Sequence, residues 1–168
     1  MYNKLPEIKS TTYEMRQLYD SAKIALGYIN KNLNDLMIET ETDGLTGVPN
    51  RRSFDLTLEK LVSSQTPFSL ILLDIDHFKS INDTYGHLIG DEVLQLLAKT
   101  LLDLSREADL CFRYGGEEFA LIVKSKDMEI AKHVAERVRT TVEKTNNPTE
   151  KIITISLGVS IYLNMGNT

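Results

Sequence analysis

The chain has 168 residues, 42% of them hydrophobic and 26% charged, as is ordinary for one globular domain with an extension. Its formal net charge of −5 argues against a general DNA or RNA binder, which needs basic residues to neutralise phosphates. The single cysteine, Cys111, excludes an intrachain disulfide and a cysteine-based zinc cage. No apolar run is long enough to span a bilayer. We therefore expect a cytoplasmic protein without a membrane segment, whose partners include no nucleic-acid polymer but could include small phosphorylated ligands.

Residues 1–42 predict a helical stalk. Between Thr11 and Glu41 there is no proline, and a set of mostly apolar residues recurs at alternating steps of three and four. The one polar member of this seam is Asn32, and a polar residue at a core position fixes the register of a coiled coil. We favour a dimerising coiled coil over the alternative, an amphipathic helix packed on its own domain. The seam consists of Met15, Leu18, Ala22, Ala25, Ile29, Asn32 and Leu36.

Residues 43–168 predict an α/β domain, an α+β sandwich with an antiparallel hairpin in its sheet. After a turn-rich joint at 43–52, the expected elements are a helix at 53–63, a strand at 67–75, helices from 77 and at 91–104, strands at 109–114 and 117–123, a helix at 128–144 and a strand at 151–163. The strand at 67–75 is continuously apolar, which is typical of burial on both faces. Gly115 and Gly116 separate two strand-like runs and predict a type I′ turn, which needs positive φ at both positions.

Carboxylates gather at the expected ends of these strands. Asp74 and Asp76 close the strand at 67–75, and Glu117 and Glu118 follow the glycine pair. Carboxylates at a strand end and on an adjacent hairpin can converge, and oxygen ligands of this kind suit Mg²⁺ bound together with substrate phosphates. Taken alone, the glutamates could equally form an exposed hairpin tip, and Asp74 could cap the helix that follows.

The segment after this strand adds groups that suit a nucleotide. His77, Phe78 and Lys79 open a helix, where free backbone N–H groups and an ammonium favour an anion. Asn82 and Asp91 carry complementary hydrogen-bonding groups, and a carboxylate can accept from the N1–H and N2 amine of guanine together. In the alternative interpretation, Asn82 belongs to a helix-ending turn and Asp91 is the N-cap of the next helix.

Four ordered segments resemble the GGDEF family of diguanylate cyclases. They are DGLTGVPNRR (43–52), LLDIDHFKSINDTYGHLIGDEVL (72–94), RYGGEEF (113–119) and ITISLGVS (153–160). The resemblance implies a GGDEF, palm-like mixed sheet flanked by helices over 43–168, with the helical stalk at 1–42. It also implies an enzyme that condenses two GTP into cyclic di-GMP and releases two pyrophosphates. The alternatives are a non-catalytic module that binds GTP or cyclic di-GMP, and a palm-type nucleotidyl transferase.

The same resemblance implies roles for individual residues. Asp74 and Glu117, with the backbone carbonyl of Ile75, would hold two Mg²⁺ ions, which Mn²⁺ could replace. Glu118 would accept a proton or assist the metal. The other substrate-binding residues would be Asn82 and Asp91 at guanine, His87 in the nucleotide pocket, Lys79 with the amides of His77 and Phe78 at the triphosphate, and Gly115 and Gly116 at the ribose and α-phosphate.

Three further expectations come from the resemblance. A homodimer through the stalk and facing catalytic domains would bring two GTP molecules together. Arg106 and Asp109 form an RxxD motif, six residues before Gly115, that matches the inhibitory product site of the family, although a surface ion pair is the alternative. The family pattern continues with a further helix and strand beyond the point where this chain ends, so we expect a C-terminally incomplete domain with exposed apolar sheet surface and weaker phosphate binding.

Overall fold

The structure is a computed structural model that describes residues 16–17, 19–29 and 41–163. The chain divides into two compact units, 1–40 and 41–168, which are described separately. In the first unit, residues 16–17 and 19–29 are helical, and this helix exposes Ile24, Tyr28 and Ile29. Three members of the predicted seam lie on it, whereas Met15, Leu18, Asn32 and Leu36 lie outside the described residues.

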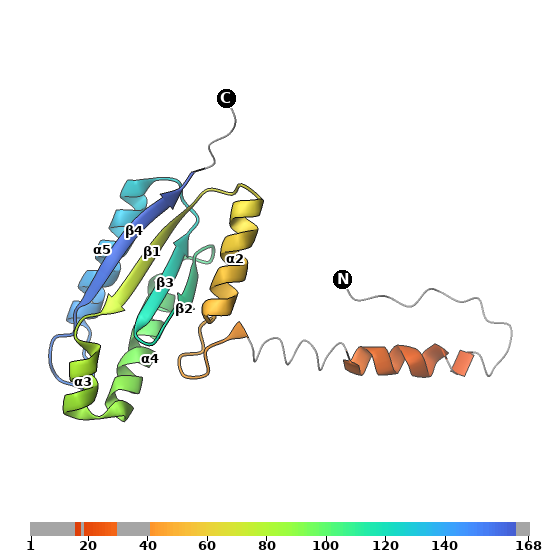
Figure 1. Cartoon of the computed structure of the whole chain (residues 1–168), viewed down its shortest axis with the longest axis horizontal. Coiled ribbons are helices and arrows are strands. Elements are labelled where there is room, and N and C mark those ends of the chain that lie inside the picture. The colour runs from red at the N-terminus through yellow and green to blue at the C-terminus, as the bar shows by residue number, and fades with distance from the viewer. Residues whose placement is uncertain (1–15, 18, 30–40, 164–168) are drawn as a thin grey trace. The chain divides into compact units, whose positions relative to one another are not determined.

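The second unit is a four-stranded sheet with helices on both faces (Figure 1). Its elements are α2 (Arg51–Ser63), β1 (Phe68–Ile75), α3 (Phe78–Tyr85), α4 (His87–Leu104), β2 (Leu110–Arg113), β3 (Glu118–Val123), α5 (Met128–Lys144) and β4 (Ile155–Tyr162). The strand order is β2-β3-β1-β4. The predicted α/β class and the helix at 128–144 are confirmed.

The sheet differs from the expected mixed one, because all three pairings among the described strands are antiparallel. After β1, the chain forms α3 and α4 and then enters β2. The hairpin after β2 reverses the chain, so that β3 pairs antiparallel with both β2 and β1. β4 then pairs with the other edge of β1, again antiparallel. β1 is therefore central, and its C-terminal end has a neighbouring strand on each side.

The two faces of the sheet have separate hydrophobic cores. On one face, α4 and α5 cover Ile71, Ile75 and Phe119, all of them essentially inaccessible to solvent. On the other face, Phe54 of α2 packs edge-to-face on Phe112, with ring centroids 5.5 Å apart. Such aromatic pairs contribute about 0.5–1.5 kcal/mol beyond their buried area. The paired cores fix the sheet between helices and so fix the strand ends that carry the acidic residues.

The helix α2 covers only part of its face of the sheet. The expectation that β1 is buried on both faces is therefore wrong. Leu72 is 42% exposed, whereas its neighbours Ile71 and Leu73 are buried under α4 and α5. The reason is that α2 packs on Phe112 and the adjoining aromatic residues and leaves the C-terminal half of β1 open. Val62 of α2 is exposed as well.

Two local predictions near the candidate site are also corrected. α4 begins at His87, so Asp91 lies inside the helix and is not an N-cap, and Asn82 lies inside α3 and not in a turn. The hairpin is not type I′, because neither Gly115 nor Gly116 has a positive φ. Instead, the carbonyl of Glu118 accepts from the N–H groups of Tyr114 and Gly115, which closes a longer loop.

Candidate functional site

The acidic residues meet at the C-terminal end of β1. Asp74 is the register partner of Glu118 on β3 and of Ser156 on β4, so these three side chains project from the same face of the sheet. They line an open groove of about 230 Å³ on the face that α2 leaves uncovered. The remaining lining residues are Leu72, Leu73, Tyr114, Phe119, Leu157 and Gly158. The predicted convergence of Asp74 with the glutamates of the hairpin is therefore present in the fold.

This cluster carries negative charge that no ion pair within the described residues neutralises. Burial raises the pKa of Asp74, and the charges of Glu117, Glu118 and Asp76 raise it further. None of the ion pairs in the described part of the chain involves Asp74, Glu117 or Glu118. Mutually repelling carboxylates without a cationic side chain are stabilised by a cation, so the donor set is suited to a divalent metal.

The ligands are not assembled into a closed cage. Within the described residues, no group of three or more His, Cys, Asp or Glu side chains is arranged to hold a metal ion. Mg²⁺ needs no such cage, because it usually keeps several waters and binds through one or two carboxylates together with substrate phosphates. An open pair of acids beside a groove fits that mode of binding.

Asp76 has a different role from Asp74, although both acids lie at the end of β1. Its carboxylate accepts hydrogen bonds from the hydroxyls of Ser156 and Thr154, each at 2.6 Å, and its N–H donates to the carbonyl of Thr154. The bonds from Ser156 and Thr154 hold the pKa of Asp76 below its ordinary value. Asp76 thus fastens β4 to the end of β1. The pattern Thr-x-Ser at the start of β4, with Thr154 just before the strand and Ser156 within it, was the available signal for this contact.

The turn after β1 delivers the N-terminus of α3. His77 adopts a left-handed conformation with φ of 58°, unusual for a residue with a side chain, and this sharp turn starts the helix directly after the acidic strand end. Phe78 is buried and anchors the first turn, whereas Lys79 is exposed. The first N–H groups of a helix lack intrahelical acceptors, so this terminus can bind an anion.

The predicted guanine-binding residues come together where α3 packs on α4. A Cβ built on Gly90 would lie 2.0 Å from Oδ1 of Asn82, so the Asn82 side chain lies directly over the helix backbone next to Asp91. Both Asn82 and Asp91 are half-buried. No hydrogen bond or ion pair in the described part of the chain links Lys79 or His87 to them. The importance of Gly90 was missed in the sequence.

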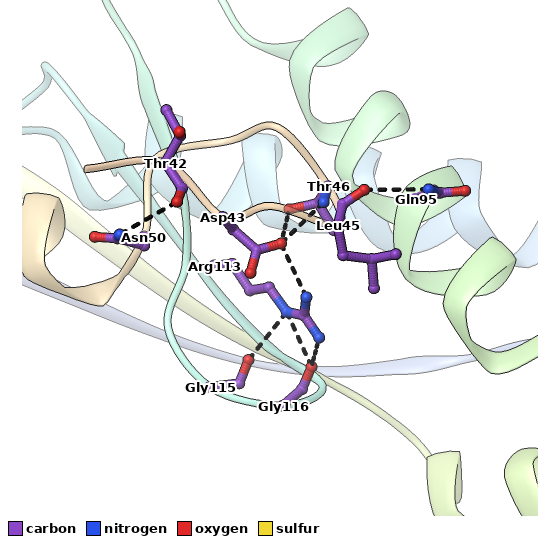
Figure 2. A network of polar contacts seen from close by, with 9 residues as sticks. All are labelled: Thr42, Asp43, Leu45, Thr46, Asn50, Gln95, Arg113, Gly115 and Gly116. Atoms are coloured by element: carbon purple, nitrogen blue, oxygen red, sulfur yellow. Dashed lines mark hydrogen bonds and ion pairs between the residues drawn. The ribbon is translucent and has the colours of Figure 1, made fainter. Parts of the chain in front are cut away.

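The signature loop has a support that sequence reasoning also missed. Arg113 donates hydrogen bonds to the carbonyls of Gly115 and Gly116 and forms an ion pair with Asp43, as Figure 2 shows. A Cβ on Gly115 would lie 2.3 Å from Oε2 of Glu118, so the first glycine leaves room for that carboxylate. A Cβ on Gly116 would meet nothing within 4 Å.

The RxxD residues lie in the turn between α4 and β2, outside any helix. The Asp109 carboxylate accepts from the N–H groups of Arg106 and Lys124, at 3.1 and 3.4 Å. None of the ion pairs of the described residues involves Arg106. The turn fixes Asp109 and leaves the exposed Arg106 guanidinium available.

Comparison with known proteins agrees with this arrangement. The profile of the family described as "Diguanylate cyclase, GGDEF domain" matches residues 40–168. The chain belongs to the GGDEF family. It is 40% identical over 138 residues to the diguanylate cyclase VdcA of Vibrio cholerae. This match covers 82% of our chain and 41% of VdcA. It is 42% identical over 150 residues to the response regulator PleD of Caulobacter vibrioides, which covers 84% of this chain and 33% of PleD.

A solved structure shares the fold of this GGDEF chain. It contains the coiled coil and GGDEF domain of DgcB from Caulobacter crescentus in complex with c-di-GMP, with a TM-score of 0.75 at 29% identity. The match covers 89% of this chain and 83% of that one. Our chain spans less than half the length of the two curated relatives. In the described residues, no helix has both the length and the apolar character needed to cross a membrane.

Proposed function

We propose that this GGDEF chain is a diguanylate cyclase that condenses two GTP into cyclic di-GMP and releases two pyrophosphates. The observation that carries the proposal is the register of Asp74 with Glu118, next to a signature loop that also brings Glu117 into electrostatic contact with Asp74. The relative VdcA is itself named a diguanylate cyclase. The uncompensated acids are what a reaction on a metal-bound triphosphate requires.

The metal-binding residues would be Asp74 and Glu117, with the backbone carbonyl of Ile75. We propose two Mg²⁺ ions per half-site, replaceable by Mn²⁺. When bound, they would lower the pKa of the attacking 3′-hydroxyl and stabilise charge on the α-phosphate and pyrophosphate. Glu118 lies in the same groove as Asp74 and is the candidate acceptor for the 3′-hydroxyl proton.

The substrate would be held at both of its ends. Asn82 and Asp91 would bind the guanine edge from the α3–α4 contact, with His87 at the exposed start of α4. At the other end, the N–H groups of His77 and Phe78 and the ammonium of Lys79 would bind the triphosphate. The signature glycines, Gly115 and Gly116, would let the ribose and α-phosphate approach the backbone.

The product needs two such half-sites. Cyclic di-GMP is two-fold symmetric, so two domains, each holding one GTP, must face each other. We propose that residues 1–42 form a dimerising stalk and that residues 43–168 form the catalytic domain, because a tethered partner raises the effective concentration of the second half-site. Ile29, a predicted seam residue, is exposed on the described helix, where a partner chain could contact it.

Product inhibition would act through Arg106 and Asp109. A guanidinium can bind a phosphate or the O6 and N7 acceptors of guanine through two hydrogen bonds, and a carboxylate can accept from N1–H and N2. The turn that carries both residues leads directly into β2 and from there into the signature loop. Binding there could therefore influence the catalytic hairpin.

The experiment that tests the proposal is incubation of the protein with GTP and Mg²⁺, followed by chromatography of the nucleotides. We expect cyclic di-GMP and pyrophosphate in a ratio of one to two. The second candidate, a non-catalytic binding module, predicts bound but unchanged GTP. A different cyclic or linear nucleotide would indicate another palm-type transferase. The retention of Asp74, Glu117 and Glu118 favours the enzyme over the module.

A further inference from the structure

We propose that Arg113 and Asp43 act together as a brace that sets the position of the GGEE loop, and that both are positioning residues for the reaction. The expected change in reaction rate rests on the proposed function, whereas the effect on the position of the loop does not. The brace itself is defined by the contacts drawn in Figure 2, which join two segments 70 residues apart in the sequence.

One end of the brace holds the signature glycines. The Nε of Arg113 donates to the carbonyls of Gly115 and Gly116, both at 3.2 Å, and Nη2 donates to Gly116 at 2.8 Å. The Arg113 side chain is 15% exposed; its bond to the Gly115 carbonyl is partly buried, whereas its bonds to the Gly116 carbonyl are exposed. Gly115 and Gly116 have no side chains that could pack against the domain. The hydrogen bonds from the Arg113 guanidinium to their carbonyls therefore hold the loop in place of side-chain packing.

The other end of the brace is the carboxylate of Asp43. Nη1 of Arg113 lies 2.9 Å from its Oδ1, and the same oxygen accepts from the N–H and the hydroxyl of Thr46 at 2.9 and 2.6 Å. Burial alone would raise the pKa of Asp43, but the bonds from Thr46 and Arg113 bring it below its ordinary value. The carboxylate is therefore ionised and fixed at neutral pH.

The loop that carries Asp43 is itself rigidly attached. The N–H of Asp43 donates to the carbonyl of Val48, and the carbonyl of Asp43 accepts from the N–H of Gly47, each at 2.8 Å. These two backbone hydrogen bonds close the turn. The carbonyl of Leu45 accepts from the side chain of Gln95 on α4 at 3.1 Å, and the carbonyl of Pro49 accepts from the N–H of Arg113 at 2.8 Å. Arg113 is therefore bonded both to this loop and to Gly115 and Gly116, so the position of the loop determines the position of the two glycines.

An arginine is required for this arrangement. Its planar guanidinium presents several donors at fixed angles, so it can bind Asp43 and both carbonyls at once. A lysine ammonium carries the same charge but cannot reproduce the fork. Replacing Arg113 by lysine therefore separates the charge from the geometry.

The kinetic consequence follows from which part of the site is braced. The loop carries Glu117, whereas the proposed guanine-binding residues lie on α3 and α4. Loosening the loop should lower kcat by about tenfold or more and raise the Mg²⁺ concentration needed for half-maximal rate. The KM for GTP should change by less than about threefold, because guanine recognition is retained.

The experiment compares the full-chain variants Arg113→Lys and Asp43→Asn with Arg139→Lys. Arg139 forms equally short ion pairs with Glu136 and Glu143 on α5, so its variant controls for loss of an arginine fork elsewhere. Two readouts are taken for each protein. The first is kcat and KM for GTP with the Mg²⁺ dependence, and the second is amide hydrogen exchange of residues 114–118, with α5 as the internal reference for global unfolding.

The brace predicts faster exchange at 114–118 in both variants, unchanged exchange in α5, and a loss in kcat without a matching rise in KM. Arg139→Lys should show neither effect. The proposal is overturned if exchange at 114–118 is the same in all four proteins, or if the variants raise KM and leave kcat unchanged. If the wild type makes no cyclic di-GMP while the loop exchanges faster in the variants, the proposed function fails and the brace stands.

Discussion

Asp74 of β1 and Glu118 of β3 are direct register partners, and their side chains leave the sheet on the same face. Burial raises the pKa of Asp74, and the charges of Glu118 and of Glu117, the residue before it, raise the pKa further. The antiparallel pairing of β1 with β3 thus places a strand-end acid against a hairpin acid. This relationship connects the order of strands in the sheet to the proposed metal chemistry.

Removal of the Asp74 charge should stabilise the metal-free protein. Because burial and the neighbouring acids place the folded pKa of Asp74 above its ordinary value of 3.8, stability is lost as the pH rises from 3.8 through the folded pKa. We expect Asp74→Asn to raise Tm at pH 7, with the difference narrowing as the pH falls through the folded pKa and absent below 3.8, where the carboxyl is protonated in both states. Mg²⁺ should raise the Tm of the wild type more than that of the variant. Asp103→Asn, at an exposed position of α4, is the matched control and should shift Tm little.

Gly90→Ala should weaken guanine binding. Alanine in place of a helical glycine normally adds about 0.5–1 kcal/mol of stability. Here the new Cβ would lie 2.0 Å from Oδ1 of Asn82 and 3.3 Å from Phe78, so the Asn82 amide must move. We expect about a tenfold loss of affinity for GDP by calorimetry, the magnitude of one lost hydrogen bond. Gly27→Ala, where a Cβ meets nothing within 4 Å, should bind GDP as the wild type does; equal affinity in Gly90→Ala would argue against Asn82 as a guanine ligand.

The proposed stalk predicts a position-specific effect on dimerisation. Ile29 belongs to the predicted seam and is 53% exposed on the described helix, whereas Ile24 is exposed at 62% but lies off the seam. A glutamate at a seam position places like charges against each other, so Ile29→Glu should weaken the dimer at least about tenfold. Multi-angle light scattering over a dilution series measures this. Equal dimerisation of Ile29→Glu and Ile24→Glu would contradict the seam.

The product site makes a separate prediction. Arg106→Ala should weaken cyclic di-GMP binding by about tenfold, because a charge-assisted double hydrogen bond is lost, and should leave GDP binding unchanged. Glu107→Ala changes an exposed residue of the same turn and is the control. Calorimetry with both ligands distinguishes the two outcomes. Unchanged product affinity in Arg106→Ala would mean that this turn is not the inhibitory site.

Much of the fold could be predicted because its signals are local. The four-residue steps of apolar residues in α5 and the apolar run of β1 each depend on neighbouring positions in the sequence. The acids at the end of β1 and after Gly116 could be identified for the same reason. Their convergence followed from the expectation of a hairpin in the sheet.

The parts that were missed depend on tertiary contacts. Whether the second face of β1 is buried depends on where α2 packs, so Leu72 could not be assigned from its own segment. The turn type depends on the Glu118 carbonyl, which accepts two N–H groups and removes the need for positive φ. The contact between Arg113 and Asp43 spans 70 residues and leaves no periodic trace in the sequence.

The measurement that tests the central claim most directly is the initial rate of cyclic di-GMP formation as a function of Mg²⁺ concentration, in the wild type, Glu117→Gln and Asp103→Asn. We predict a saturable Mg²⁺-dependent rate in the wild type and in Asp103→Asn. In Glu117→Gln, which keeps the shape of the side chain and loses its charge, the rate should fall at least about a hundredfold at every Mg²⁺ concentration. A Glu117→Gln rate within about tenfold of the wild type would contradict the assignment of the signature acids to the metal site.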